Sequence, residues 1–179
     1  MLSSLLLFIS LQTANAGTLS SVTMPDTVTV GGQTLVLNGL GLREKYFFDI
    51  YVGGLYLPAK TTSSTSAIGD DVPKRLQMTF IYSAVTKAQI VETFEENLAK
   101  QSDAAAVKDR FDTLYSYCSD VAAGDSIIFD YVPGTGTTVT VKGKVMGTIA
   151  GVDFMKSLWT VYLGASPPTK NLKTGMMGG

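Results

Sequence analysis

The spacing of hydrophobic and polar positions predicts a sheet of antiparallel strands interrupted by helices. In several separate segments hydrophobic residues alternate with polar ones, as they do in strands that bury one face. We therefore predict strands at residues 19–24, 27–30, 34–37, 46–57, 75–82, 126–132, 137–141 and 145–149. Gly31 and Gly32 separate the second of these strands from the third, and they indicate a hairpin turn.

In three other segments the hydrophobic spacing changes to about 3.6 residues, which is typical of helices. One helix is predicted from Thr86, a residue type that caps helix N-termini, through Lys100. A second begins after Asp103 and ends before Gly124, and a third covers residues 153–163. Strands and helices do not alternate one by one, so this order indicates a single α+β domain with an antiparallel sheet.

The long strand at residues 46–57 has two different faces. Its even face presents the apolar or aromatic residues Tyr46, Phe48, Ile50, Val52 and Tyr56, whereas its odd positions include Asp49 and Gly53. Because an antiparallel sheet often covers only one face, we expect the even face to be the covered one. We also expect residues 61–66, rich in Ser and Thr, to form a surface loop, and the end of the chain around residues 173–179 to fray.

The amino-acid composition excludes several kinds of catalysis and of binding partner. The chain has 179 residues, 14 Lys and Arg, 15 Asp and Glu, and no histidine. Without histidine, Ser-His-Asp and Cys-His catalysis and histidine metal ligation are excluded. A net charge of -1 provides no basic field for a phosphate backbone, so nucleic acid is not an expected partner. The single cysteine, Cys118, excludes an intramolecular disulfide, and its place on an apolar helical stripe predicts a small buried hydrophobic residue.

The N-terminus carries the features of an export signal. An apolar run at residues 5–11 is followed by Ala14-Asn15-Ala16, a small-residue cleavage pattern. The run is shorter than the roughly 20 residues that a bilayer-spanning helix needs. We therefore predict a signal peptide at residues 1–16 that is cleaved near Ala16, and a mature domain at residues 17–179 in the periplasm or outside the cell.

Two polar residues stand in otherwise apolar surroundings. Arg43 follows the glycine-rich stretch at residues 38–42, where it either binds an anion at the mouth of an apolar cleft or forms a surface ion pair. Asn97 falls on the apolar stripe of the first predicted helix, where its amide either satisfies a backbone group or lines a pocket. The spacing by itself leaves both alternatives open.

Five short motifs occur in order along the chain. They are Gly39-Leu40-Gly41-Leu42-Arg43, Val52-Gly53-Gly54-Leu55-Tyr56-Leu57, Lys74-Arg75-Leu76, Gly124-Asp125 and Gly164-Ala165-Ser166-Pro167. In this order and spacing the chain resembles the chalcone isomerase-like family, in its exported bacterial branch, over about residues 25–178. The resemblance implies an open-faced β-sandwich, in which helices pack on one face of a large antiparallel sheet and leave an apolar cleft between them.

Plant enzymes of this family cyclise a chalcone to a flavanone with an arginine, a threonine, a tyrosine and an asparagine at the cleft. The resemblance places Arg43 at the arginine and Asn97 at the asparagine. Tyr51 falls at the threonine position and Ile90 at the tyrosine position. A hydrocarbon side chain therefore stands where the enzymes have a phenol.

An arginine combined with a tyrosine at the threonine position resembles the non-catalytic, fatty-acid-binding branch of the family, in which these groups hold a carboxylate. A guanidinium donates two directed, charge-assisted hydrogen bonds and a phenol donates one. We therefore expect a binding protein for a fatty acid or similar apolar carboxylate, with ligand-binding residues Arg43, Tyr51 and Asn97 and with neither metal nor cofactor.

Two other functions stay open at this point, and the resemblance favours neither over binding. One is an intramolecular lyase of the chalcone isomerase type acting on an enone. The other is haem binding, for which a Met, a Tyr or Cys118 would have to supply the axial ligand because histidine is absent.

Overall fold

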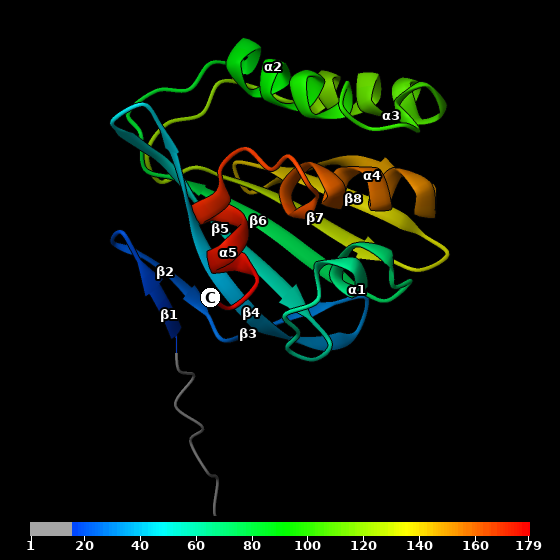
Figure 1. Ribbon diagram of the computed structural model, residues 1–179, viewed down its shortest axis with the longest axis horizontal. Coiled ribbons are helices and arrows are strands. Elements are labelled where there is room, and N and C mark those ends of the chain that lie inside the picture. Colours follow the sequence, from blue (N-terminus) through cyan, green and yellow to red (C-terminus); the bar gives the residue numbers. More distant parts are fainter. Residues whose placement is uncertain (1–15) are drawn as a thin grey trace, which may run out of the picture.

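The computed structural model describes residues 16–179 (Figure 1). The strands in this part of the chain are β1 (Ala16–Leu19), β2 (Val22–Pro25), β3 (Thr27–Val30), β4 (Gln33–Lys45), β5 (Phe48–Leu57), β6 (Lys74–Phe80), β7 (Ser126–Val132), β8 (Gly136–Val141) and β9 (Lys144–Ile149). The helices are α1 (Ser64–Gly69), α2 (Lys87–Leu98), α3 (Ala104–Tyr117), α4 (Val152–Leu163) and α5 (Lys170–Met176). The predicted signal peptide falls, apart from its last residue, outside the described residues.

Strands β3 to β9 form one antiparallel sheet, in which each strand is hydrogen-bonded to the next one along the chain. The sheet curls, which brings Gly31 in the β3–β4 turn against Val132 at the end of β7. Strands β1 and β2 form a separate two-stranded ribbon. Helices α2, α3 and α4 cover one face of the sheet (Figure 1). The predicted α+β class and the open-faced β-sandwich are therefore confirmed.

Both faces of β5 are buried, which corrects the expectation of a single covered face. The odd positions Tyr51 and Leu55 belong to the main core beneath the helices. The even positions Val52 and Tyr56 belong to a second, smaller core under the β1–β2 ribbon, where the Tyr56 hydroxyl donates to the carbonyl of Pro25 at 2.9 Å. Helices thus cover the face that looked mixed in the sequence, and Gly53 on that face leaves room for Leu172 and Met176 of α5.

The end of the chain does not fray, contrary to expectation. Helix α5 packs against β4 and β5 and buries Leu172 and Met176 completely. A Cβ at Gly39 or Gly41 would collide with the α5 backbone, so these two glycines of β4 admit the helix. A contact between segments so far apart in the sequence leaves no sign in local periodicity.

Other segments also differ from the sequence prediction. The single strand predicted at residues 19–24 is instead broken by a turn at Ser20 and Ser21, both with positive φ, and the strand predicted at residues 34–37 extends to Lys45. Residues 61–66 were expected to be a loop, but the helix α1 begins within them, capped by the Ser63 side chain, which accepts from the Ser66 amide. The strand expected from residue 46 starts only at Phe48, because Tyr46 adopts a left-handed conformation (φ +58°) in the β4–β5 turn.

The helices themselves begin where the sequence predicts. Thr86 caps α2 in a reciprocal capping box with Gln89. Asp103 is the first flanking residue of α3, although its side chain makes no capping hydrogen bond. Within residues 16–179, none of the helices is both long and apolar enough to cross a bilayer.

Candidate functional site

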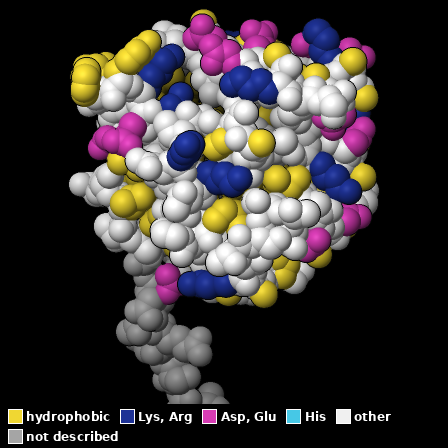
Figure 2. Space-filling view, viewed as in Figure 1, with side chains coloured by type: hydrophobic (Ala, Val, Ile, Leu, Met, Phe, Trp, Pro, Cys, Tyr) yellow, Lys and Arg dark blue, Asp and Glu magenta, His cyan; other side chains and the backbone are white. Residues whose placement is uncertain are grey.

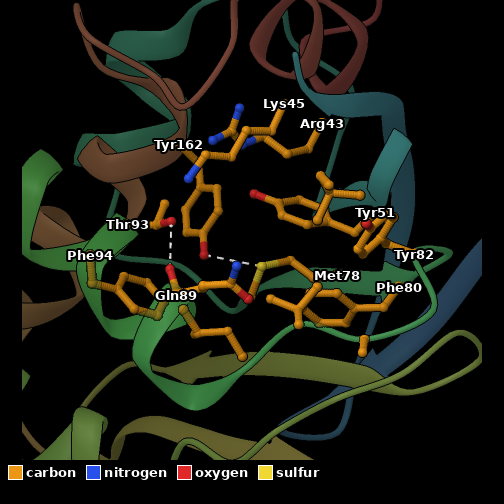
Figure 3. Close-up of a pocket in the computed structure, with 14 residues that line it drawn as sticks. Arg43, Lys45, Tyr51, Met78, Phe80, Tyr82, Gln89, Thr93, Phe94 and Tyr162 are labelled. Carbon is orange, nitrogen blue, oxygen red and sulfur yellow. Dashed lines mark hydrogen bonds between the residues drawn. The ribbon is translucent and has the colours of Figure 1, made fainter. Parts of the chain in front are cut away.

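A cavity of about 80 Å³ opens between the sheet and helix α2, beside α4. Strands β4, β5 and β6 supply one wall, and α2 with the segment before it supplies the other (Figure 3). The lining side chains are Arg43, Lys45, Ile50, Tyr51, Met78, Phe80, Tyr82, Ala84, Val85, Gln89, Ile90, Thr93, Phe94 and Tyr162. Most of this surface is hydrocarbon or aromatic, and the charged groups on it are cations.

Arg43 and Tyr51, which the sequence singled out, lie together in this cavity. The two residues are directly opposite each other on the antiparallel strands β4 and β5, and Phe80 of β6 is opposite Tyr51 on its other side. The rings of Tyr51 and Phe80 meet edge to face, with centroids 5.4 Å apart. Strand register therefore fixes a guanidinium and a phenol side by side on the helix-covered face of the sheet.

The guanidinium of Arg43 retains donors for a ligand. Its Nη1 donates to the carbonyl oxygen of Glu44 at 2.6 Å. Among residues 16–179 it makes no ion pair with a carboxylate. Lys45, two residues further along β4, also lines the cavity, and none of the lining residues is acidic. Figure 3 shows the cationic ends of Arg43 and Lys45 on the same side of the cavity. This side favours an anion.

Two phenols line the buried part of the cavity. Burial raises the pKa of Tyr51 above its ordinary value, and the nearby charge of Arg43 opposes this only in part. Burial likewise raises the pKa of Tyr162, whose hydroxyl contacts the Met78 sulfur at 3.2 Å. The Tyr51 hydroxyl points into the cavity (Figure 3) and makes no hydrogen bond to another described residue. A neutral phenol of this kind is a donor to an anionic ligand.

Helix α2 contributes an apolar wall. Ile90 and Phe94 both face the cavity and are almost fully buried. Thr93 also lines it, but its hydroxyl already donates to the Gln89 carbonyl at 3.0 Å. Ile90, the position that the resemblance matched to the tyrosine of the plant enzymes, therefore presents hydrocarbon to the cavity.

Asn97 lies outside this cavity. Its Nδ2 donates to the Thr93 carbonyl at 2.7 Å, and its buried Oδ1 has no partner within residues 16–179. The side chain lines a separate, more polar depression of about 410 Å³, together with Lys100, Lys156 and Thr160. The structure thus brings Arg43 and Tyr51 together and places Asn97 elsewhere, one helical turn beyond Thr93.

Sequence reasoning missed Lys45 and Tyr162 as cavity residues. Lys45 was recoverable in principle, because residues two apart on a strand share a face and Arg43 was already a candidate. Tyr162 was not, since aromatic residues at helical spacing look alike whether they fill a core or line a cavity. The position of α4 over the sheet decides between the two.

Cys118 lies at the end of α3 and is buried, as the sequence predicts. Its sulfur contacts the Leu114 carbonyl at 3.4 Å, and burial raises its pKa to about 11. It does not line the cavity. In the part of the chain that the structure describes, no three His, Cys, Asp or Glu side chains gather in a group that could hold a metal ion.

Comparison with known proteins identifies the class of this molecule. A family model described as chalcone isomerase-like matches residues 16–178. The chain therefore belongs to the chalcone isomerase-like family. Its fold is similar to that of an Arabidopsis thaliana fatty-acid binding protein seen in a crystal structure, with a TM-score of 0.73 and 15% sequence identity over 91% of this chain and 96% of that chain. A search of curated proteins found no match.

Proposed function

We propose that this protein binds an apolar carboxylate of the fatty-acid type in the cavity between the sheet and α2. The observation that carries the proposal is the cross-strand pair of Arg43 and Tyr51 on the wall of an apolar cavity that has no acidic lining residue. The guanidinium donates charge-assisted hydrogen bonds to the carboxylate and Tyr51 donates one more, while Lys45 adds positive charge. The fatty-acid binding protein of similar fold supports the same class of ligand.

The size of the cavity limits how a chain enters. A volume of about 80 Å³ is less than that of an apolar cavity of roughly 150 Å³ that holds benzene. A ligand with more than a few carbon atoms therefore has to displace side chains. Met78 and Ile90 are placed for this, because both line the cavity and Met78 has a flexible, unbranched side chain. Each methylene that becomes buried contributes about 0.8 kcal/mol.

The binding test is a titration with saturated fatty acids of increasing length, from butyrate to palmitate. The affinity is expected to rise with each added methylene until the side chains that line the cavity, such as Met78 and Ile90, can move no further. Arg43→Met is expected to weaken binding about 10- to 100-fold, because it removes charge-assisted hydrogen bonds worth about 1.5–3 kcal/mol.

Arg110→Met is the matched control. It also removes a guanidinium, but one paired on the surface with Asp153 and absent from the cavity lining. A wild-type protein without affinity for any acid of the series would refute the proposal, and so would equal losses in the two variants.

We also propose that the protein is exported. The support is the cleavage pattern ending at Ala16 and the apolar run before it. A domain that begins at Gly17 would keep the remainder of the β1–β2 ribbon, in which Gly17 is paired with Met24. The test is a cell fractionation that finds the processed chain in the periplasm or the medium.

A further inference from the structure

Three aromatic side chains project at the turn between β4 and β5. Tyr46 is 86% exposed, Phe47 is 99% exposed and Phe48 is 54% exposed. We call these three residues the aromatic tip. In Figure 2 hydrophobic side chains gather at the upper left corner, where Figure 1 places the β4–β5 turn, and a Lys or Arg side chain lies beside them. Large apolar side chains grouped at one exposed point mark an interaction site.

The backbone of the turn presents these rings outward. Tyr46 adopts φ +58°, a left-handed conformation that Gly and Asn adopt more easily than a residue with a bulky ring. Phe47 follows it at the apex and belongs to neither of the two hydrophobic cores. The protein thus holds aromatic side chains at a position where neither backbone geometry nor packing requires them.

The aromatic tip adjoins the cavity. Lys45, which lines the cavity, is directly opposite Phe48 at the end of the β4–β5 pair. Phe48 in turn packs edge to face on Tyr82, another lining residue, with ring centroids 5.4 Å apart. A surface that covered the tip would therefore lie next to the end of the cavity that carries the positive charge.

The charges on the segment that carries the tip, residues 43–49, cancel. Arg43 and Lys45 alternate along the strands with Glu44 and Asp49, two cations against two carboxylates. Such a region is not drawn to a strongly charged surface of either sign. A Tyr ring is instead favoured at the interface between lipid headgroups and hydrocarbon, where its apolar body and its polar end are both accommodated. Phe rings enter the adjoining boundary with the acyl chains.

The area of the tip favours a bilayer over a specific protein partner. The three rings present roughly 500 Å², whereas a specific protein complex buries about 800 Å² on each partner. A bilayer sets no such minimum, because individual side chains can enter it separately.

We propose that the aromatic tip inserts into the interface of a zwitterionic phospholipid bilayer and holds the Arg43–Lys45 end of the cavity against the lipid. The docking rests on the exposed rings and on the charge balance. Its use, the exchange of an apolar carboxylate between bilayer and cavity, rests on the proposed function.

The test is flotation of the full mature chain with phosphatidylcholine vesicles, without added fatty acid, at low and at high salt. The wild-type protein is expected to float with the vesicles at both salt concentrations, because the insertion of neutral rings does not depend on the screening of charges by salt. The double variant Tyr46→Asn/Phe47→Ser is expected to lower the bound fraction by about tenfold or more. Asn tolerates the left-handed backbone and Phe47 packs on nothing, so this variant keeps the fold.

Val152→Ser is the matched control, because it removes another exposed apolar side chain, 40% exposed, at the start of α4 near the opposite end of the sheet. Wild type that stays with the soluble fraction, or a double variant that floats as well as wild type, would overturn the proposal. If the wild-type protein forms a reversible dimer that the double variant does not form, the tip binds a second copy of the chain and the bilayer proposal is overturned.

A fluorescent variant supplies the second readout. Phe47→Trp is expected to be quenched by vesicles that contain brominated phosphatidylcholine, while the single native tryptophan, Trp159, is fully buried and is not quenched in wild type. Failure to quench Phe47→Trp counts against insertion.

Binding of fatty acid in solution is measured separately, without vesicles. A protein that floats but binds no fatty acid refutes the proposed function alone, and one that binds fatty acid but does not float refutes the docking alone.

Discussion

Replacing Tyr51 with Phe separates a binding role of its hydroxyl from a structural one. The substitution removes one oxygen atom and leaves the ring that packs against Phe80. The Tyr51 hydroxyl makes no hydrogen bond to another described residue, so no bond among these residues is lost. The free energy of unfolding of the unliganded variant is therefore expected to change by less than about 1 kcal/mol. For a chain of this length that is a shift in Tm of less than about 4 °C.

Binding should respond quite differently to the same change. The lost bond is one from a phenol to a carboxylate, worth about 1.5–3 kcal/mol, so the Kd for a fatty acid is expected to rise about 10- to 100-fold. Because burial raises the pKa of Tyr51, the phenol stays neutral and remains a donor at alkaline pH. The ratio of variant to wild-type Kd is therefore expected to be constant from about pH 6 to about pH 9.

The assays are thermal unfolding without ligand and calorimetric titration with a fatty acid. Tyr82→Phe is the matched control, since Tyr82 also lines the cavity but is partly exposed and stands outside the Arg43–Tyr51 pair. A Tyr51→Phe variant that loses stability but keeps its affinity would refute the reasoning. So would a loss of affinity no larger than that of the control.

Three further outcomes are expected. Gly41→Ala should lower the free energy of unfolding by about 1–3 kcal/mol in denaturant titrations, because its Cβ would collide with the backbone of Leu172; Gly69→Ala, where nothing lies within 4 Å, should be nearly neutral, and equal effects would contradict the packing argument. Cys118 should resist a thiol reagent at pH 8, since a pKa of about 11 leaves about one thousandth of it as thiolate, and reactivity should increase as the pH rises or after unfolding; rapid labelling of the native protein would contradict this. The mass of the exported protein should correspond to a chain that begins at Gly17, and the full-length mass in that fraction would contradict cleavage.

Much of the fold follows from local sequence. The strand at residues 126–132 alternates strictly between buried and half-buried positions, and it is found at the predicted bounds. The helix after Thr86 begins where a capping box satisfies its first amides. In both cases the residues that determine the structure are neighbours in the chain.

The errors have a common cause in contacts between distant segments. Gly53 contributes to the mixed face of the long strand, and together with Gly39 and Gly41 of β4 it also admits α5 from the far end of the chain. The sequence predicts a frayed tail because chain ends are poorly ordered unless another segment holds them. Its stability comes instead from burying Leu172 and Met176 against β4 and β5.

The candidate site was also predictable only in part, because some of its features follow from the sequence and others depend on contacts between distant segments. Residue types and a family resemblance were enough to identify Arg43 and Tyr51. The structure adds that they are direct neighbours, because the antiparallel register of β4 and β5 pairs them. Asn97 was grouped with them on the same grounds, but it faces a different depression. Ile90 and Asn97 are seven residues apart on one helix, so a helical wheel places them on the same stripe. The wheel does not show which other part of the protein packs against each turn of the helix.

By itself, then, the sequence determined the class of fold, most element boundaries, the family and the pairing of an arginine with a tyrosine. These depend on periodicity, capping and short motifs, which act over a few residues. Only the tertiary structure decided which face of the sheet the helices cover, which side chains share the cavity with Arg43, and that three aromatic rings stand exposed beside it. The physical reason is that burial and cavity lining depend on which surfaces meet when distant segments pack, and local spacing carries no information about that.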